Sequence, residues 1–595
     1  MKKIIFSLMA CALLGVVSCE SMLEIPQKGV VSYDSFYASD DDALAALTSM
    51  YANYIQNVAG TEGIDNPEQV MLNYAADDVM AAGGNPKDHE PFRYFCEFTY
   101  DNANGTLKQA YQRYYFSIYH ANLVISNFTN ENRNQVEPKH TSAFTAQAVA
   151  EARVMRAYLH MMLALSWYCP PIVDRLLDAD ELPSPAESQS QVLEWVIAEC
   201  EKAISSGALP VRASKNDKDA TARMSVGFAQ FIAGKAAMFN NDPATARKYL
   251  GDLINSGKYD LVPTEEYWTN FHVAGDGSVE KIFEPNFLED PAYTNNAWGS
   301  GAPIQRGRWM VANVFCWRTD ALASQPQPHD GFQGWNGGAV QETFAEKFLA
   351  HDGNSPRRRA CFLTGDEWLY EMEWNSELND ATLAEKEKDP KRGIASAAGV
   401  FSHGPYFEWK HMVFVKPPKI LTGGKEYPSD HVTGLGPASN QKNFNVARYA
   451  EALLLYAEAC IGSADEAKGL QALNAVQVRS GSNQISESLT FEAVMEEKQY
   501  EMWFESCRFH DLVRWGNQGK VDLDQIFNKS GIHTKVPTVF DAFFTKGEAK
   551  HRLYTEYQAL NAGFVVGKHE YFPFPHDFMV VNPNLKNVLG WSSVE

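Results

Sequence analysis

Residues 444–459 read FNVARYAEALLLYAEA, and residues 497–516 read EKQYEMWFESCRFHDLVRWG. Both segments place apolar and small residues at helical spacing, with charged residues between them. Residues three or four positions apart share one face of a helix, so these charges are spaced to pair with one another or to anchor loop backbone. Structural ion pairs are therefore predicted for Arg448, Glu451, Glu505, Arg508, Asp511 and Arg514. Tyr456 and Trp515 are predicted to lie in the core.

Two helical pairs with a similar pattern are predicted. One consists of 446–461 and 463–479, and Ser480-Gly481 ends it. The other lies within 223–256, where Asp242-Pro243 supplies an N-cap and a proline at the first helical position. Its length of about 34 residues and its alternation of small and large residues fit a tetratricopeptide repeat. Two ordinary helical hairpins are the alternative.

Other parts of the chain differ in texture. Helical spacing also follows the acidic cap at 40–42 and runs through 154–165, so helical pairs are expected within about 40–256 and 446–516. From about 257 to 445 the chain is rich in Gly, Pro, Asn and Trp and shows little sustained period. Eight of the 13 tryptophans lie there: Trp268, Trp298, Trp309, Trp317, Trp335, Trp368, Trp374 and Trp409. Long loops inside a globular protein often carry function, so this region is predicted to bind the ligand.

Several segments resemble motifs of the SusD/RagB family, in the order in which the family carries them. They are the two segments quoted first, together with EARVMRAY at 151–158, LNAVQVRSG at 473–481, YFPFP at 571–575 and NPNL at 582–585. Lys498 and Ser506 stand where the family usually has arginine and glycine. The resemblance implies a mainly α-helical SusD-like fold, in which tetratricopeptide-type pairs pack against a loop-rich ligand-binding portion with few short strands. It also implies a single domain over 19–595.

The N-terminus has the pattern of a lipoprotein signal peptide. Lys2 and Lys3 precede an apolar run, 4–17, that is too short to span a bilayer comfortably. Ser18-Cys19 then resembles a bacterial lipobox, although Val17 departs from its commonest form. Residues 1–18 are therefore predicted to be removed and Cys19 to be lipidated. An ordinary signal peptide is the alternative.

The charge of the chain excludes some partners. Removing residues 1–18 takes away two lysines and no acidic residue, so the formal charge changes from −22 to −24. Such an acidic chain does not have the excess of positive charge that binding to nucleic acid requires. Attachment to a membrane must therefore come from the lipid on Cys19. The seven cysteines after Cys19 are scattered singly without a CxxC motif, which predicts buried thiols rather than zinc or redox sites.

Enzyme motifs are missing from the sequence. The 15 histidines form no HExxH, and neither a P-loop nor a GxSxG motif occurs. Gly434-Leu435-Gly436 lacks the third glycine of a dinucleotide-binding loop. No catalytic residue, metal site or cofactor is therefore expected. A helical-repeat glycosidase is the remaining enzyme alternative, since one sequence cannot show two carboxylates facing each other.

The family resemblance also implies a function. SusD-like proteins are lipid-anchored proteins on the outer-membrane surface of Bacteroidetes, and they pass nutrients, mostly glycans, to a SusC-like TonB-dependent transporter. The resemblance implies that the helical repeats face this transporter and that loops on the opposite side hold the glycan. A peptide or another non-glycan nutrient is the alternative ligand.

Two clusters supply candidate ligand-binding residues. Aromatic rings stack on the C–H faces of sugars, and amides, acids and guanidinium groups bond to sugar hydroxyls. One cluster contains Tyr293, Asn295, Asn296, Trp298, Arg306, Arg308 and Trp309. The other contains Asn73, Tyr74 and Asp77, where family members carry part of their ligand loop. For each single tryptophan, packing in the core is the alternative.

Overall fold

A computed structural model describes much of the chain: residues 36–59, 66–83, 87–132, 134–287, 315, 337–364, 367, 406–431, 440–529, 536–539, 556–558, 563–587 and 590–591. Within these ranges the protein is mainly helical, as the sequence predicts, and its strands are short. The predicted signal peptide and Cys19 lie outside the described residues.

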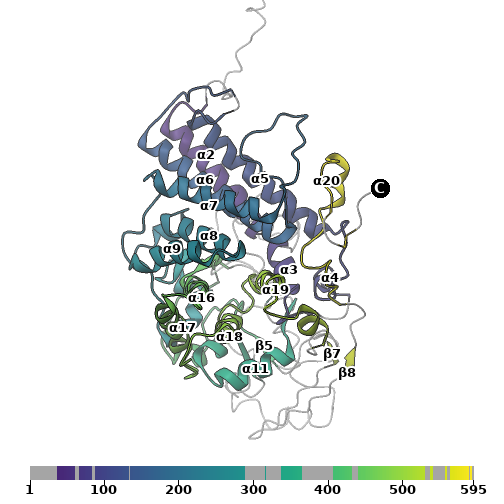
Figure 1. Ribbon diagram of the computed structural model, residues 1–595. Coiled ribbons are helices and arrows are strands. Elements are labelled where there is room, and N and C mark those ends of the chain that lie inside the picture. Colours follow the sequence, from purple (N-terminus) through teal and green to yellow (C-terminus); the bar gives the residue numbers. More distant parts are fainter. Residues whose placement is uncertain are drawn as a thin grey trace, which may run out of the picture.

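Helical pairs stacked one on another form the body of the molecule (Figure 1). In the described ranges these pairs are α2 (Asp40–Ala59) with α5 (Gly105–Phe128), α6 (Ala143–Trp167) with α7 (Gln189–Ser205), α8 (Val226–Phe239) with α9 (Pro243–Asn255), and α16 (Tyr449–Cys460) with α17 (Glu466–Ser480). Successive pairs touch through α5 and α6, α7 and α8, and α9 and α16. The two predicted pairs are confirmed, and α9 packs directly on α16 although the whole loop-rich region separates them in sequence.

Caps and close contacts explain why these pairs form where the sequence places them. The Asp242 side chain accepts a hydrogen bond from the Thr245 N–H, at 3.0 Å, at the start of α9. Gly481 ends α17 with a φ of 74°, a conformation that favours glycine. Within the α8–α9 pair, a Cβ on Gly234 would lie 2.5 Å from the Cγ of Leu250, so the two helices approach too closely for any side chain there.

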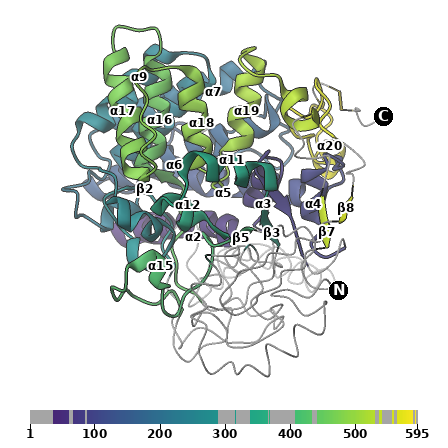
Figure 2. The same ribbon diagram turned by 90° about the horizontal axis from the view of Figure 1, so that it is seen from below.

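Shorter helices pack around this stack. They are α3 (Pro67–Tyr74), α4 (Glu90–Cys96), α11 (Glu342–Asp352), α12 (Pro356–Cys361), α15 (Lys419–Thr422), α18 (Phe491–Glu501), α19 (Arg508–Asn517) and α20 (His576–Val581). Short 3₁₀ segments occur at Asp219–Ala222, Thr264–Phe271 and Val273–Gly275, and a π-helical turn at Gln525–Lys529. Helix α18 packs against α16 and α17, while α19 packs against α3 (Figure 2).

Four antiparallel strand pairs occur in the described ranges. They are β1 (Val79–Ala81) with β3 (Gly338–Val340), β2 (Lys281–Phe283) with β6 (Ala447–Arg448), β4 (Phe362–Thr364) with β5 (Tyr406–Glu408), and β7 (Val536–Val539) with β8 (Glu556–Gln558). The first two pairs join the region predicted as loop-rich to the helical blocks on either side of it. That region also contains α11 and α12, which the sequence analysis missed.

A large hydrophobic core runs through the whole stack. It includes Trp515 and Tyr456, as predicted, and also Trp268 and Trp409. The other six tryptophans of the 257–445 region lie outside the described residues. The described cysteines after Cys19 are buried and free, as predicted: Cys96, Cys169, Cys200, Cys361, Cys460 and Cys507.

Candidate ligand-binding face

The family motifs form a buried ion cluster between α16 and α18. The guanidinium of Arg448 donates through Nε and Nη2 to the two carboxylate oxygens of Glu505, each at 2.7 Å, and through Nη1 to Glu280 at 2.5 Å. Glu501 accepts from Arg448 and from Arg479. Burial alone would raise the pKa of Glu505, but Arg448 and Lys410 lower it to about 2.

The other charged motif residues also pair inside the protein. Arg514 donates to both oxygens of Glu458, each at 2.8 Å, and the indole N–H of Trp515 donates to Glu458 at 2.9 Å. Lys498 contacts Asp511 at 2.6 Å and Glu451 at 3.5 Å. Each of these charged residues pairs with another side chain of the protein, which confirms the predicted structural role.

The predicted ligand residues on α3 and after it are buried. Asn73 accepts from the Ser506 N–H at 2.7 Å, and Tyr74 donates its hydroxyl proton to the Gly337 carbonyl at 2.8 Å. Asp77 forms a two-point ion pair with Arg508, at 2.7 and 2.9 Å. These contacts tie α3 to α19 and β3. Because the side chains of Asn73, Tyr74 and Asp77 are at most 4% exposed, their burial argues against direct contact with a ligand.

Asp78 lies next to this ion pair in an environment that disfavours its charge. It is 1% exposed, and its backbone carbonyl accepts from the indole of Trp503 at 2.9 Å. Burial and the charge of Asp77 raise the pKa of Asp78 to about 8, against the opposing influence of Arg508. This carboxyl is therefore mostly neutral at pH 7.

The predicted loop cluster lies outside the described residues: Tyr293, Asn295, Asn296, Trp298, Arg306, Arg308 and Trp309. The described chain does show where this loop begins. The Phe287 N–H donates to the Asn443 side-chain oxygen at 2.9 Å, and the Asn443 amide donates to Asn286 at 2.8 Å. These bonds fix the start of the loop beside the segment that leads into α16.

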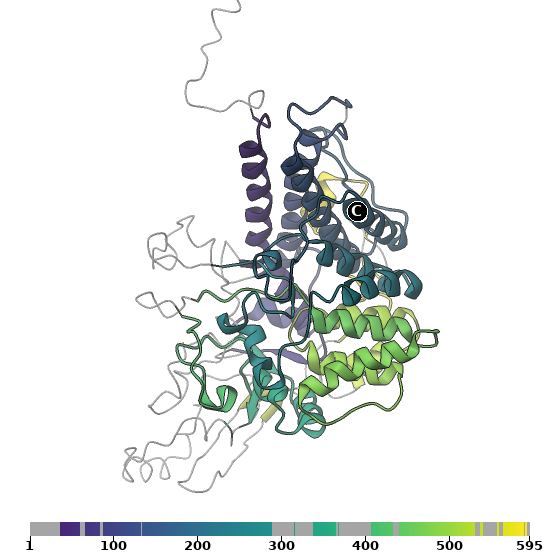
Figure 3. The same cartoon turned by 90° about the vertical axis from the view of Figure 1, so that its left-hand side faces the viewer.

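A surface groove runs along α2 and ends at this loop entrance. Its cavity volume is 250 Å³. The residues that line it are Leu44, Leu47, Thr48, Tyr51, Tyr54 and Ile55 of α2, with Ala222, Arg223, Phe283, Pro285 and Asn286. We call it the α2 groove. Helix α2 lies at the edge of the helical stack, on the side away from α16 and α17 (Figure 3).

The polar part of the α2 groove is built around Glu151 of α6, which is fully buried. Arg223 donates to both Glu151 oxygens, through Nε at 2.9 Å and through Nη2. The Tyr51 hydroxyl donates to Glu151 at 2.6 Å, and the Gln147 amide donates at 2.9 Å. Burial and the neighbouring Glu151 raise the pKa of Tyr51 well above its usual range, so the hydroxyl stays protonated as a donor.

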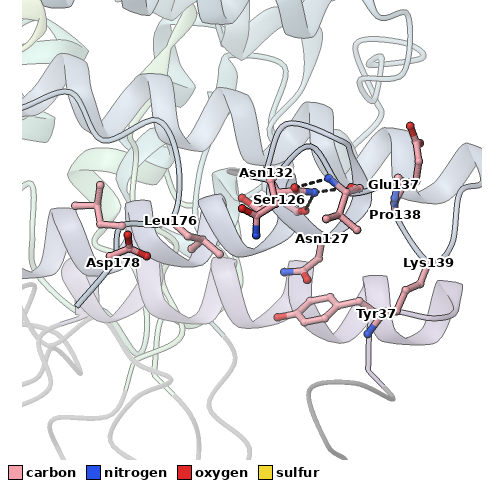
Figure 4. Close-up of a pocket in the computed structure, with 12 residues that line it drawn as sticks. Tyr37, Ser126, Asn127, Asn132, Glu137, Pro138, Lys139, Leu176 and Asp178 are labelled. Carbon is pink, nitrogen blue, oxygen red and sulfur yellow. Dashed lines mark hydrogen bonds between the residues drawn. The ribbon is translucent and has the colours of Figure 1, made fainter. Parts of the chain in front are cut away.

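A second cavity lies at the far end of α5 and has a volume of 380 Å³. Figure 4 shows it between the turn that follows α5, the segment with Leu176 and Asp178, and the ring of Tyr37. The amide of Asn132 donates to the Val136 carbonyl at 2.6 Å, and its oxygen accepts from the Val136 N–H at 2.7 Å. This amide therefore holds the turn together. The α2 groove is taken as the candidate site because Pro285 and Asn286, which line it, lie just before the predicted ligand loop.

Sequence reasoning missed the α2 groove for a simple reason. The apolar stripe from Leu44 to Tyr54 reads as a core-facing surface, and most of it is buried. Leu44, however, is 53% exposed. The side chains that complete the groove, Arg223 and Phe283, come from distant parts of the chain. The exposed leucine in an otherwise regular stripe gave no signal that could be read without the structure.

The described residues show no sign of metal chemistry, since no three His, Cys, Asp or Glu side chains among them are placed to hold an ion. Within the same ranges, no helix has the length and apolar composition to cross a bilayer.

Comparison with known proteins agrees with the fold. The model of the SusD family matches residues 425–591. A SusD-like protein of Bacteroides ovatus is 22% identical over 535 residues, which cover 87% of this chain and 83% of that protein. Surface glycan-binding protein A of Bacteroides thetaiotaomicron, solved in complex with laminarihexaose, is 20% identical with a TM-score of 0.66, over 92% of this chain and 99% of that one. A laminarin-binding SusD-like protein gives 21% identity and a TM-score of 0.63, over 92% and 98%.

Proposed function

The chain belongs to the SusD/RagB family, and on that premise we propose that it is a cell-surface glycan-binding lipoprotein of a nutrient-uptake complex. It captures an oligosaccharide or polysaccharide and delivers it to a SusC-like TonB-dependent transporter in the outer membrane. Its role is binding without hydrolysis. Lipid on Cys19 holds it at the surface.

The observation that carries this proposal is the likeness, over nine-tenths of the chain, to a protein solved with laminarihexaose bound. The chemistry of the chain supports it. The charged side chains of the family motifs form ion pairs with one another or with other parts of the fold, so they are unavailable for acid–base catalysis. Tryptophan, tyrosine, asparagine and arginine gather instead in the predicted loop cluster at 293–309, and a sugar needs flat rings and hydrogen-bonding groups.

The ligand is tested by calorimetry of the full chain without its signal peptide. The panel contains laminarihexaose, maltohexaose, cellohexaose, xylohexaose and mannohexaose, with a mixture of tripeptides as the alternative nutrient. We expect one hexasaccharide to bind and to be recovered intact by chromatography. Trp298→Ala and Trp309→Ala should each weaken that binding about tenfold. Binding of tripeptides alone, or cleavage of the sugar, would refute the proposal.

The anchor and the partner are tested in the native host. Cys19→Ala should release the protein from the membrane fraction and abolish palmitate labelling. The wild-type protein, solubilised in mild detergent, should co-purify with a TonB-dependent barrel. Unchanged fractionation of the variant would argue against the anchor, and purification of this protein alone would argue against the partner.

A further inference from the structure

We propose that the α2 groove is a second sugar subsite, which takes one uncharged ring of the bound glycan. This inference rests on the proposed glycan-binding function and adds a place on the scaffold that contacts the glycan. Three features of the described residues support it: the charge balance of the groove, its walls and its position.

The first feature is a neutral hydrogen-bonding group. Each oxygen of Glu151 accepts two hydrogen bonds: Oε2 accepts from Arg223 Nε and from the Tyr51 hydroxyl, and Oε1 accepts from Arg223 Nη2 and from the Gln147 amide. Arg223 therefore brings no net charge to the groove, because Glu151 balances it. Its Nη1 group donates to no described residue, and the side chain is 37% exposed. A neutral ligand with hydroxyl oxygens can accept from this group, whereas a charged ligand would gain little.

The second feature is the apolar part of the lining. Leu44, Leu47 and Ile55 lie on one stripe of α2, and Phe283 and Pro285 also line the cavity. A sugar ring has an apolar C–H face and a hydroxyl edge, and this groove offers one surface for each. Its 250 Å³ lie just below the range of about 300–1,000 Å³ for pockets that enclose a drug-sized ligand. It is thus suited to one ring rather than to a whole oligosaccharide.

The third feature is the position of the groove. Pro285 and Asn286 line it, and the predicted ligand loop begins directly after Phe287. Asn443 fixes this junction through its bonds to Phe287 and Asn286. The groove therefore lies at the entrance of the loop that the sequence predicts to hold the glycan.

The test fills the groove without touching the ion cluster. Thr48 is an exposed groove residue of α2, and Ala45 is an exposed residue of the same helix that does not line the groove. Thr48→Trp and Ala45→Trp add the same side chain, so they form a matched pair. Calorimetry uses the hexasaccharide that binds best in the five-member panel above. Thr48→Trp should weaken its binding about fivefold or more, and Ala45→Trp should leave it unchanged.

A second variant tests whether the effect is peculiar to the tryptophan side chain. Thr48→Arg blocks the groove with a flexible charged side chain, and Ala45→Arg is its control; both Thr48 variants should melt within about 2 °C of the wild type. If the wild type binds a hexasaccharide and both Thr48 variants bind it equally well, the subsite is wrong while the proposed function stands. If the wild type binds no sugar of the panel, the proposed function and the subsite fall together. If the Thr48 variants keep their sugar affinity but lose the co-purifying barrel, the groove is a protein-docking surface and the proposal is overturned.

Discussion

Two arginine–glutamate clusters use the same groups in opposite settings. Arg448 is fully buried, and its three guanidinium nitrogens all donate to Glu280, Glu501 or Glu505. Arg223 is partly exposed, and among the described residues Glu151 is its one ion-pair partner. Arg448 keeps no guanidinium nitrogen without an acceptor, and its cluster holds α16, α18 and β2 together. In the second cluster, Nη1 of Arg223 donates to no residue in the described ranges. An arginine that can bind a ligand is thus recognised by guanidinium N–H groups that have no acceptor within the protein.

The largest effect is expected from Arg448→Ala. Removing this guanidinium leaves Glu280, Glu501 and Glu505 buried with only part of their compensating charge. Breaking a buried ion pair on one side typically costs about 3–5 kcal/mol of unfolding free energy. Urea denaturation followed by circular dichroism measures this loss, with Arg448→Lys as the control that keeps the charge and shows a smaller loss. A loss below about 1 kcal/mol would mean that the cluster is not what fixes α16 and α18.

Trp515→Ala should come next. The side chain is fully buried, and its N–H donates to Glu458, so the variant leaves a cavity and removes one hydrogen bond. Truncation of a buried tryptophan costs about 3–5 kcal/mol. Thermal melts measure the loss. Binding of the panel hexasaccharide, measured well below the melting temperature, should stay unchanged; weaker binding would show that the core and the ligand face are coupled.

The same contrast explains what the sequence could predict. Helix pairs, their caps and the motif ion pairs follow from local spacing, so 226–255 and 449–480 are predicted with ends wrong by at most a few residues. Asn73, Tyr74 and Asp77 read as surface residues because they are polar. Their partners, Ser506, Gly337 and Arg508, lie hundreds of positions away. Neither this burial nor the contact between α2 and Arg223 can be predicted from residues that are close together in the sequence.

Asp78 and Asp77 should respond to mutation in opposite ways, and the effect at Asp78 should depend on pH. The pKa of Asp78 is about 8 in the folded protein, above the value of about 3.9 in an unfolded chain. The stability that the protonated Asp78 carboxyl allows, measured as the free energy of unfolding, is therefore fully present below pH 4. It is lost as the pH rises towards 8. Asp78→Asn, which cannot ionise, should gain about 1–3 kcal/mol over the wild type by pH 8 and much less at pH 4.

Urea denaturation at pH 4, 6 and 8 measures that gain. The neighbouring change Asp77→Asn serves as the control, because it breaks the two-point pair with Arg508 and should destabilise the protein at pH 6 and 8. A gain from Asp78→Asn that does not grow with pH would contradict the raised pKa.

Arg223→Gln should have the smallest effect on stability and is the most direct test of the comparison. The Arg223 side chain is 37% exposed, so shortening it opens a path for water to the Glu151 oxygens, which are buried in the wild type. Glu151 also keeps its bonds from Tyr51 and Gln147. We expect a loss of about 1 kcal/mol, the upper end for exposed ion pairs, in the same urea assay as Arg448→Ala. Arg223→Lys is the control, because it keeps the positive charge beside Glu151 but cannot form the two-point hydrogen bond. If Arg223→Gln destabilises the chain as much as Arg448→Ala, then Arg223 is a core anchor like Arg448, and the free donor in the α2 groove has no separate role to explain.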